Sequence, residues 1–127
     1  MKAAVFLLLL AGASPAAAID WRQAREVELR LTGFDVTPAT MRLKAGQPVR
    51  VRLVNASRGA FRMDARDFLA AATIRTRDAR AIEDGVVRVA AGRTVELSLV
   101  PRAGRYKIGA SSFIYRILGM RGNIVVE

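Results

Sequence analysis

The chain has 127 residues, enough for one domain, and its 52% hydrophobic and 25% charged residues are typical of a folded globular protein. It contains neither cysteine nor histidine. Disulfides, thiol nucleophiles, Ser-His-Asp catalysis, iron–sulfur clusters, haem held by His or Cys, and zinc sites built from Cys and His are therefore excluded. Lysine and arginine number 21 against 11 acidic residues, so the formal net charge is +10.

The first 18 residues have the pattern of a secretory signal peptide. Lys2 supplies a cationic start, an apolar run occupies residues 3–11, and Ala16-Ala17-Ala18 forms a small-residue cleavage pattern. The apolar run is too short to span a bilayer. We expect cleavage after Ala18, which leaves a soluble periplasmic protein of residues 19–127 with no transmembrane segment and, without Lys2, a net charge of +9. A retained N-terminal anchor is the alternative.

After residue 18 the sequence is dominated by short stretches in which polar and apolar residues alternate. A period of two is typical of strands with one buried and one exposed face. Turns rich in glycine and proline separate these stretches, and we expect strands over residues 26–31, 40–44, 48–55, 84–89, 94–100, 105–109 and 122–127. The pattern predicts a single all-β domain, a sandwich or barrel of seven or eight strands with Greek-key connections.

Residues 64–81 interrupt the alternation. They set Phe68, Leu69 and Ile74 among many alanines and arginines. We expect one or two helical turns, or an irregular insertion, that crosses an edge of the sandwich.

Five short motifs follow one another in a characteristic order along the chain. They are LKAGQPV at residues 43–49, LVN at 53–55, AGRT at 91–94, PRAGRY at 101–106 and LGMRGNIVV at 118–126. In order and spacing they resemble the cupredoxin family, which includes plastocyanin and azurin. The likeness extends to small exported bacterial proteins grouped with the cupredoxin domain of EfeO-type iron-uptake proteins. It covers nearly all of residues 19–127 and implies a cupredoxin-like sandwich.

The same resemblance assigns the family's four copper-ligand positions to Phe61, Ala110, Tyr115 and Met120. A type-1 copper site needs two imidazoles and a thiolate, with a weak axial thioether, and only Met120 keeps the family's residue type. Phenylalanine and alanine offer no donor atom, and a phenol keeps its proton up to about pH 10. We therefore expect no bound metal or other cofactor, and we expect Phe61, Phe113, Tyr115 and Met120 to fill the vacated pocket as an apolar plug.

A redox or metal-carrier protein with a non-standard site is the alternative. Copper or another ion would then be held by Met120, Tyr115 and carboxylates. The available carboxylates lie in or beside the irregular segment, at Asp64, Asp67, Asp78, Glu83 and Asp84. Arginines are interleaved with them, so ion pairs on a solvated surface explain the pattern better than an oxygen-ligand site.

The excess of arginine indicates a cationic partner-binding surface. In cupredoxins the final loop lies at the same end of the sandwich as the loop that follows the position of Asn55. This implies that Arg58, Arg62, Arg116 and Arg121 surround one end, which would attract an acidic partner. Candidates are an acidic periplasmic protein, an inner-membrane protein such as a metal-transporter component, or anionic lipid. Nucleic acid is not expected. A purely compositional origin of the arginines is the alternative.

These patterns predict a non-enzymatic, exported accessory module. No paired carboxylates, phosphate-binding loop or nucleophile–base arrangement marks a catalytic site. The resemblance places the protein beside metal handling, in iron uptake or copper homeostasis, and a structural domain without a binding role is the remaining option.

Overall fold

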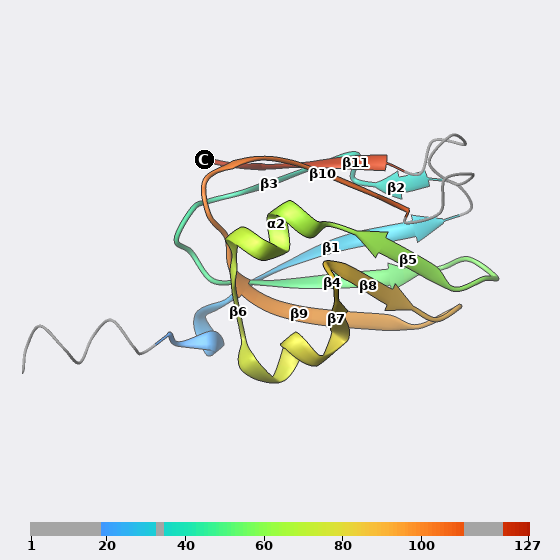
Figure 1. Cartoon of the computed structure of the whole chain (residues 1–127), viewed down its shortest axis with the longest axis horizontal. Helices are drawn as coiled ribbons and strands as arrows, with labels where there is room; N and C mark the ends of the chain where they lie inside the picture. Colours follow the sequence, from blue (N-terminus) through green and yellow to red (C-terminus); the bar gives the residue numbers. More distant parts are fainter. Residues whose placement is uncertain (1–18, 33–34, 111–120) are drawn as a thin grey trace, which may run out of the picture.

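The computed structural model describes residues 19–32, 35–110 and 121–127, which form two β-sheets packed face to face (Figure 1). The predicted signal peptide, residues 1–18, lies outside these residues. In chain order the elements are η2 (Trp21–Gln23), β1 (Arg25–Thr32), β2 (Asp35–Thr37), β3 (Thr40–Leu43), β4 (Val49–Asn55), β5 (Phe61–Asp64), α2 (Arg66–Ala71), β6 (Thr73–Ile74), η3 (Thr76–Ala81), β7 (Ile82–Glu83), β8 (Val86–Val89), β9 (Thr94–Val100), β10 (Gly104–Ala110) and β11 (Arg121–Val126).

The chain passes repeatedly from one sheet to the other, so strands that follow one another in sequence often belong to different sheets. One has five strands in the order β2-β1-β4-β9-β6, and the other has six in the order β3-β11-β10-β5-β8-β7. Most neighbours are antiparallel, but β1 runs parallel to β4 and β3 runs parallel to β11. The predicted Greek-key β-sandwich is confirmed.

All seven strands expected from the alternation are present. Four further strands, β2, β5, β6 and β7, are only two to four residues long. They bring the total in the described ranges to eleven rather than seven or eight. Segments of two or three residues are too short to display a period of two, so β2, β6 and β7 are recognised as strands only by their pairing with a neighbouring strand.

The expected insertion at residues 64–81 contains two short helical segments, α2 and η3, with β6 between them. The side chains of Phe68 and Leu69 in α2 are buried, whereas η3 buries none. Strand β6 pairs with β9 at the edge of the five-stranded sheet, and β7 pairs with β8 at the edge of the six-stranded sheet. The insertion therefore crosses from one sheet to the other along one side of the sandwich.

The core lies between the inward faces of the two sheets. Strand β4 alternates buried and half-buried residues over its whole length, with Val49, Val51 and Leu53 inward. Strands β9, β10 and β11 supply Leu97, Leu99, Ile108, Ile124 and Val126 to the same core. No helix among the described residues has both the length and the apolar composition needed to cross a membrane.

Candidate functional site

Two of the predicted ligand positions, Phe61 and Ala110, lie in the apolar core. Phe61 begins β5 and is 5% exposed, and Ala110 ends β10 and is 2% exposed. In the ladder between these strands Ala110 lies opposite Met63, which shares the inward face of β5 with Phe61. Phe61 and Ala110 are therefore diagonal neighbours on one sheet face, a separation at which side chains contact the same neighbours. Phe113, Tyr115 and Met120 lie outside the described residues.

Asn55, immediately before the loop that leads to Phe61, is one of only two buried polar or charged side chains in the described ranges. Its Nδ2 donates to the carbonyl oxygens of Gly59 at 2.8 Å and Val89 at 2.9 Å. Its Oδ1 accepts from the backbone N–H of Ser57 at 3.0 Å and from the Ser57 hydroxyl at 2.6 Å. The asparagine of the LVN motif thus shapes the β4–β5 loop and holds Phe61 at its position.

The PRAGRY motif forms the turn before β10 and the first residues of that strand. Gly104 has a φ of +154°, and a Cβ on it would lie 2.8 Å from the Tyr106 hydroxyl oxygen, so a side chain there would have to displace the Tyr106 ring. That hydroxyl donates to the Arg102 carbonyl at 2.9 Å, and the ring meets Phe68 edge-on with centroids 5.4 Å apart. The motif therefore stabilises the start of the strand that ends at Ala110.

No protein-family model matches the sequence, and no curated protein matches it. Solved structures do match. Auracyanin B aligns with a TM-score of 0.62 and 17% identity over 86% of this chain and 93% of its own. Reduced auracyanin from the photosynthetic bacterium Roseiflexus castenholzii aligns with a TM-score of 0.61 and 13% identity over 82% and 98%. The multicopper oxidase McoA from the hyperthermophile Aquifex aeolicus gives 0.65 and 14% over 87% of this chain but 31% of the oxidase.

The chain has the cupredoxin fold. The identities are low, so the match is one of fold, and the metal chemistry has to be judged from the residues themselves. Position 61 carries an aromatic hydrocarbon and position 110 a methyl group, and the whole sequence contains no imidazole or thiol. These residues do not fit a type-1 copper ion, because two of its three strong donors would have to come from side chains that have no donor atom.

Two of the five carboxylates considered for a non-standard site have other contacts. The Asp64 Oδ1 lies 3.6 Å from Nε of Arg66, and an oxygen of Asp78 accepts the backbone N–H of Ser98 at 2.9 Å, which attaches η3 to β9. Across residues 19–32, 35–110 and 121–127, no three carboxylates gather closely enough to share an ion.

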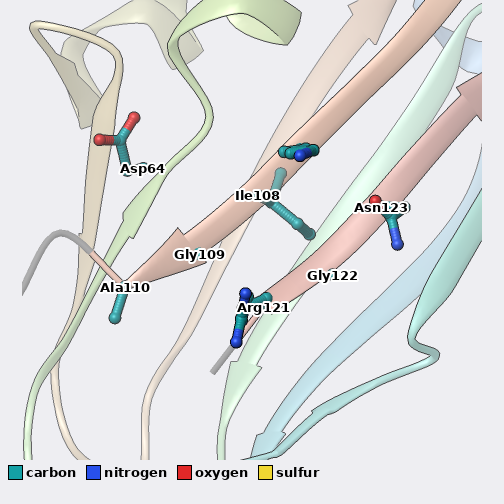
Figure 2. Close-up of a pocket in the computed structure, with 8 residues that line it drawn as sticks. Asp64, Ile108, Gly109, Ala110, Arg121, Gly122 and Asn123 are labelled. Atoms are coloured by element: carbon teal, nitrogen blue, oxygen red, sulfur yellow. The ribbon is translucent and has the colours of Figure 1, made fainter. Parts of the chain in front are cut away.

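A hollow of about 440 Å³ opens where β10 and β11 meet near Ala110 (Figure 2). Figure 2 shows Gly109 in the middle, with Asp64 on the β5 side and Arg121 and Asn123 on the β11 side. Gly109 lies opposite both Asp64 and Arg121 in the two ladders. The lining is mixed, with both signs of charge, so it does not have the composition of a dedicated copper pocket.

Three of the four arginines predicted to surround one end lie in the described part of the chain. Arg58 is exposed in the β4–β5 loop, Arg62 is exposed near the start of β5, and Arg121 is exposed at the start of β11. The β4–β5 loop and the facing ends of β10 and β11 lie at the same end of the sandwich, at the right in Figure 1. Arg116 lies outside the described residues.

The outer faces of the two sheets differ sharply in charge. On the five-stranded sheet, Arg50 and Arg52 lie 3.4 and 3.6 Å from Glu26, and further pairs involve Glu28 and Glu96. That face is close to neutral. The outward residues of the six-stranded sheet carry two carboxylates, Asp64 and Glu83, against a larger set of cations: Arg42, Arg62, Arg88, Arg105, Lys107 and Arg121.

Of the cations on the outer face of the six-stranded sheet, only Arg62 and Arg121 were identified from the sequence as partner-binding residues. The alternation places Arg105 and Lys107 on one face of their strand and Arg121 and Asn123 on one face of theirs. Which strands lie side by side, however, is decided by pairing between distant segments, such as β3 with β11. The charge of the assembled face therefore becomes visible only with the ladder register.

Proposed function

We propose that this protein is an exported, non-enzymatic cupredoxin-fold module that acts by binding an acidic partner protein and not by holding copper. The partner we favour is an acidic periplasmic or inner-membrane protein concerned with iron or copper handling, such as a metal-transporter component. The metal setting is supported by the fold, which this chain shares with auracyanins and with a domain of multicopper oxidases. Export is supported by the signal-peptide pattern of residues 1–18.

The observation that carries the proposal is the burial of Phe61 and Ala110. Both are nearly inaccessible and belong to the same core cluster as Met63, Val89 and Ile108. A buried phenylalanine at this position contributes packing energy that a ligand-lined cavity would not. Apolar contacts therefore stabilise the fold around positions 61 and 110. We propose that the protein acts through its charged surface instead.

The surface supports an acidic partner because its charge is both large and unevenly distributed. Arg58, Arg62 and Arg121 are exposed, and the last two also belong to the cationic outer face of the six-stranded sheet. Surfaces of one sign accelerate encounter with partners of the opposite sign, most strongly at low ionic strength.

Metal analysis of protein recovered from the periplasm tests this function. We expect a chain that begins at Ile19 by mass spectrometry, a metal content well below one equivalent, and no intense thiolate-to-copper charge-transfer band when copper is added. Stoichiometric copper or iron that survives dialysis against a chelator would overturn the proposal. It would favour instead a metal carrier that uses Met120, Tyr115 and carboxylates.

A pull-down from membranes addresses the partner. The wild-type protein is expected to retain an acidic protein that Arg58→Glu/Arg62→Glu releases. Retention that is unchanged by this double reversal would count against the cationic end as the contact surface.

A further inference from the structure

A hollow of about 410 Å³ follows β11 across the outer face of the six-stranded sheet. We call it the β11 trough, and its outward-facing lining consists of Thr40, Arg42, Arg105, Lys107, Asn123 and Val125. The ladder explains its shape. Val125 lies between Arg42 and Arg105, and Asn123 lies between Thr40 and Lys107, so a strand with short side chains is flanked by longer cationic ones. Through Lys107 and Asn123 the trough is continuous with the hollow beside Gly109.

The cations of the trough are available to a partner. Arg105 and Lys107 are exposed and form no ion pair with any described residue, and the segments outside the described ranges contain no aspartate or glutamate. Arg42 approaches Glu127 at 3.5 Å, but their side chains are 72% and 78% exposed. An ion pair this exposed contributes little and is easily exchanged for another carboxylate.

The spacing of these cations matches an extended peptide. Arg105 and Lys107 are alternate residues of one strand, so they lie about 7 Å apart, the same repeat as alternate side chains of any extended chain. Arg42 and Arg105 are separated by one intervening strand, which places their backbones about 10 Å apart. That width admits one extended chain over β11 with cations on both sides.

We infer that the β11 trough binds an extended acidic segment of a partner protein, with aspartate or glutamate at alternate positions. The inference rests on the proposed function and names the surface and the partner chemistry. A lipid surface is disfavoured because, among the described residues of this face, no large apolar side chain projects outward to enter a bilayer. Single-stranded nucleic acid is disfavoured because no aromatic side chain projects there for base stacking.

Binding of short synthetic peptides, followed by heteronuclear NMR, tests the inference. The main probe alternates glutamate and threonine, a second has the same composition with its glutamates in one block, and a third replaces glutamate by glutamine. We expect the alternating peptide to bind most tightly, to shift the amide signals of β3, β10 and β11, and to be released by salt. Arg105→Glu/Lys107→Glu is expected to weaken binding roughly tenfold or more.

The matched control is Arg77→Glu/Arg80→Glu, which changes the net charge equally at two exposed positions of η3, remote from the trough. It is expected to bind the alternating peptide nearly as well as the wild type. The inference would be overturned by an equal loss of affinity in both variants or by amide shifts confined to other strands. Equal binding of the peptide that has its glutamates in one block would also overturn it. Preferential binding to phosphatidylglycerol vesicles, unaffected by the alternating peptide, would also overturn it. Each of these results leaves the proposed function standing, since that depends on the metal content and on Arg58 and Arg62.

Discussion

The Asn55 side chain donates a hydrogen bond to the Val89 carbonyl at 2.9 Å and thereby joins the end of β4 in one sheet to the end of β8 in the other. The second amide hydrogen reaches Gly59 and the side-chain oxygen accepts from Ser57, so all the polar capacity of a side chain that is 1% exposed is used within the β4–β5 loop and its neighbour. This one residue connects the two layers and sets the loop that leads to Phe61.

Asn55→Ala is expected to lower the free energy of unfolding by about 2–3 kcal/mol, because it leaves the Val89 carbonyl and the loop without their buried partner. Urea unfolding followed by circular dichroism measures the change. Asn123→Ala, at an exposed position of β11, is the control and is expected to change stability by less than about 0.5 kcal/mol. Equal effects of the two substitutions would contradict the role given to Asn55.

Gly85→Ala is expected to destabilise strongly. Gly85 has a φ of +75°, and a Cβ there would lie 2.3 Å from Cγ and 2.7 Å from Cα of Arg66, so α2 would have to move. Gly92 has a similar φ of +69° with no atom within 4 Å of its Cβ position. Gly92→Ala should therefore show only the backbone cost, about 1 kcal/mol, and Gly85→Ala clearly more. Equal thermal midpoints for the two variants would show that α2 yields to the new methyl group without cost.

The long strands were predictable because each has one solvent-exposed face and one buried face. Val49, Val51 and Leu53 alternate with Arg50 and Arg52, and that local pattern survives in the fold. Strand β6 was not predictable in this way, because Thr73 and Ile74 are extended only through pairing with Val100 and Leu99. Short edge strands depend on where the neighbouring strand ends.

In the candidate site, too, some features follow from local sequence and others depend on pairing between distant strands. The resemblance assigns Phe61 by counting back from residues 67–69 and Ala110 by its position after Tyr106, and the structure shows that both lie in the core. The β11 trough could not be located, because Arg42 and Arg105 are brought to the two sides of Val125 by ladders between distant segments. Likewise the sequence does not reveal that Arg50 and Arg52 are paired, because the glutamates beside them belong to the neighbouring strands β1 and β9.

Phe61→Ala is expected to cost about 3–5 kcal/mol, because it removes a large buried side chain from a close-packed cluster. Phe61→Leu keeps most of the apolar volume and is expected to cost less than about 1.5 kcal/mol. Denaturant unfolding should show a lower midpoint with an unchanged slope in both cases. A small loss for the alanine variant would mean that position 61 is not a packed part of the core and would contradict the proposal that apolar packing takes the place of a ligand-lined cavity.

Glu26→Gln tests whether the neutral face of the five-stranded sheet is stabilised by its charge pairs. Glu26 lies between two arginines, with oxygens 3.4 Å from Arg50 and 3.6 Å from Arg52, and its side chain is half exposed. Because exposed pairs are weak and screened, the expected loss is about 0.5–1 kcal/mol at low salt, falling toward zero near 1 M NaCl, where the screening length is about 3 Å. Glu83→Gln in β7, whose carboxylate has no ion pair in the described ranges, should be neutral at both salt concentrations. A loss for Glu26→Gln that persists at high salt would mean that packing of its side chain against β4, and not charge pairing, stabilises this face.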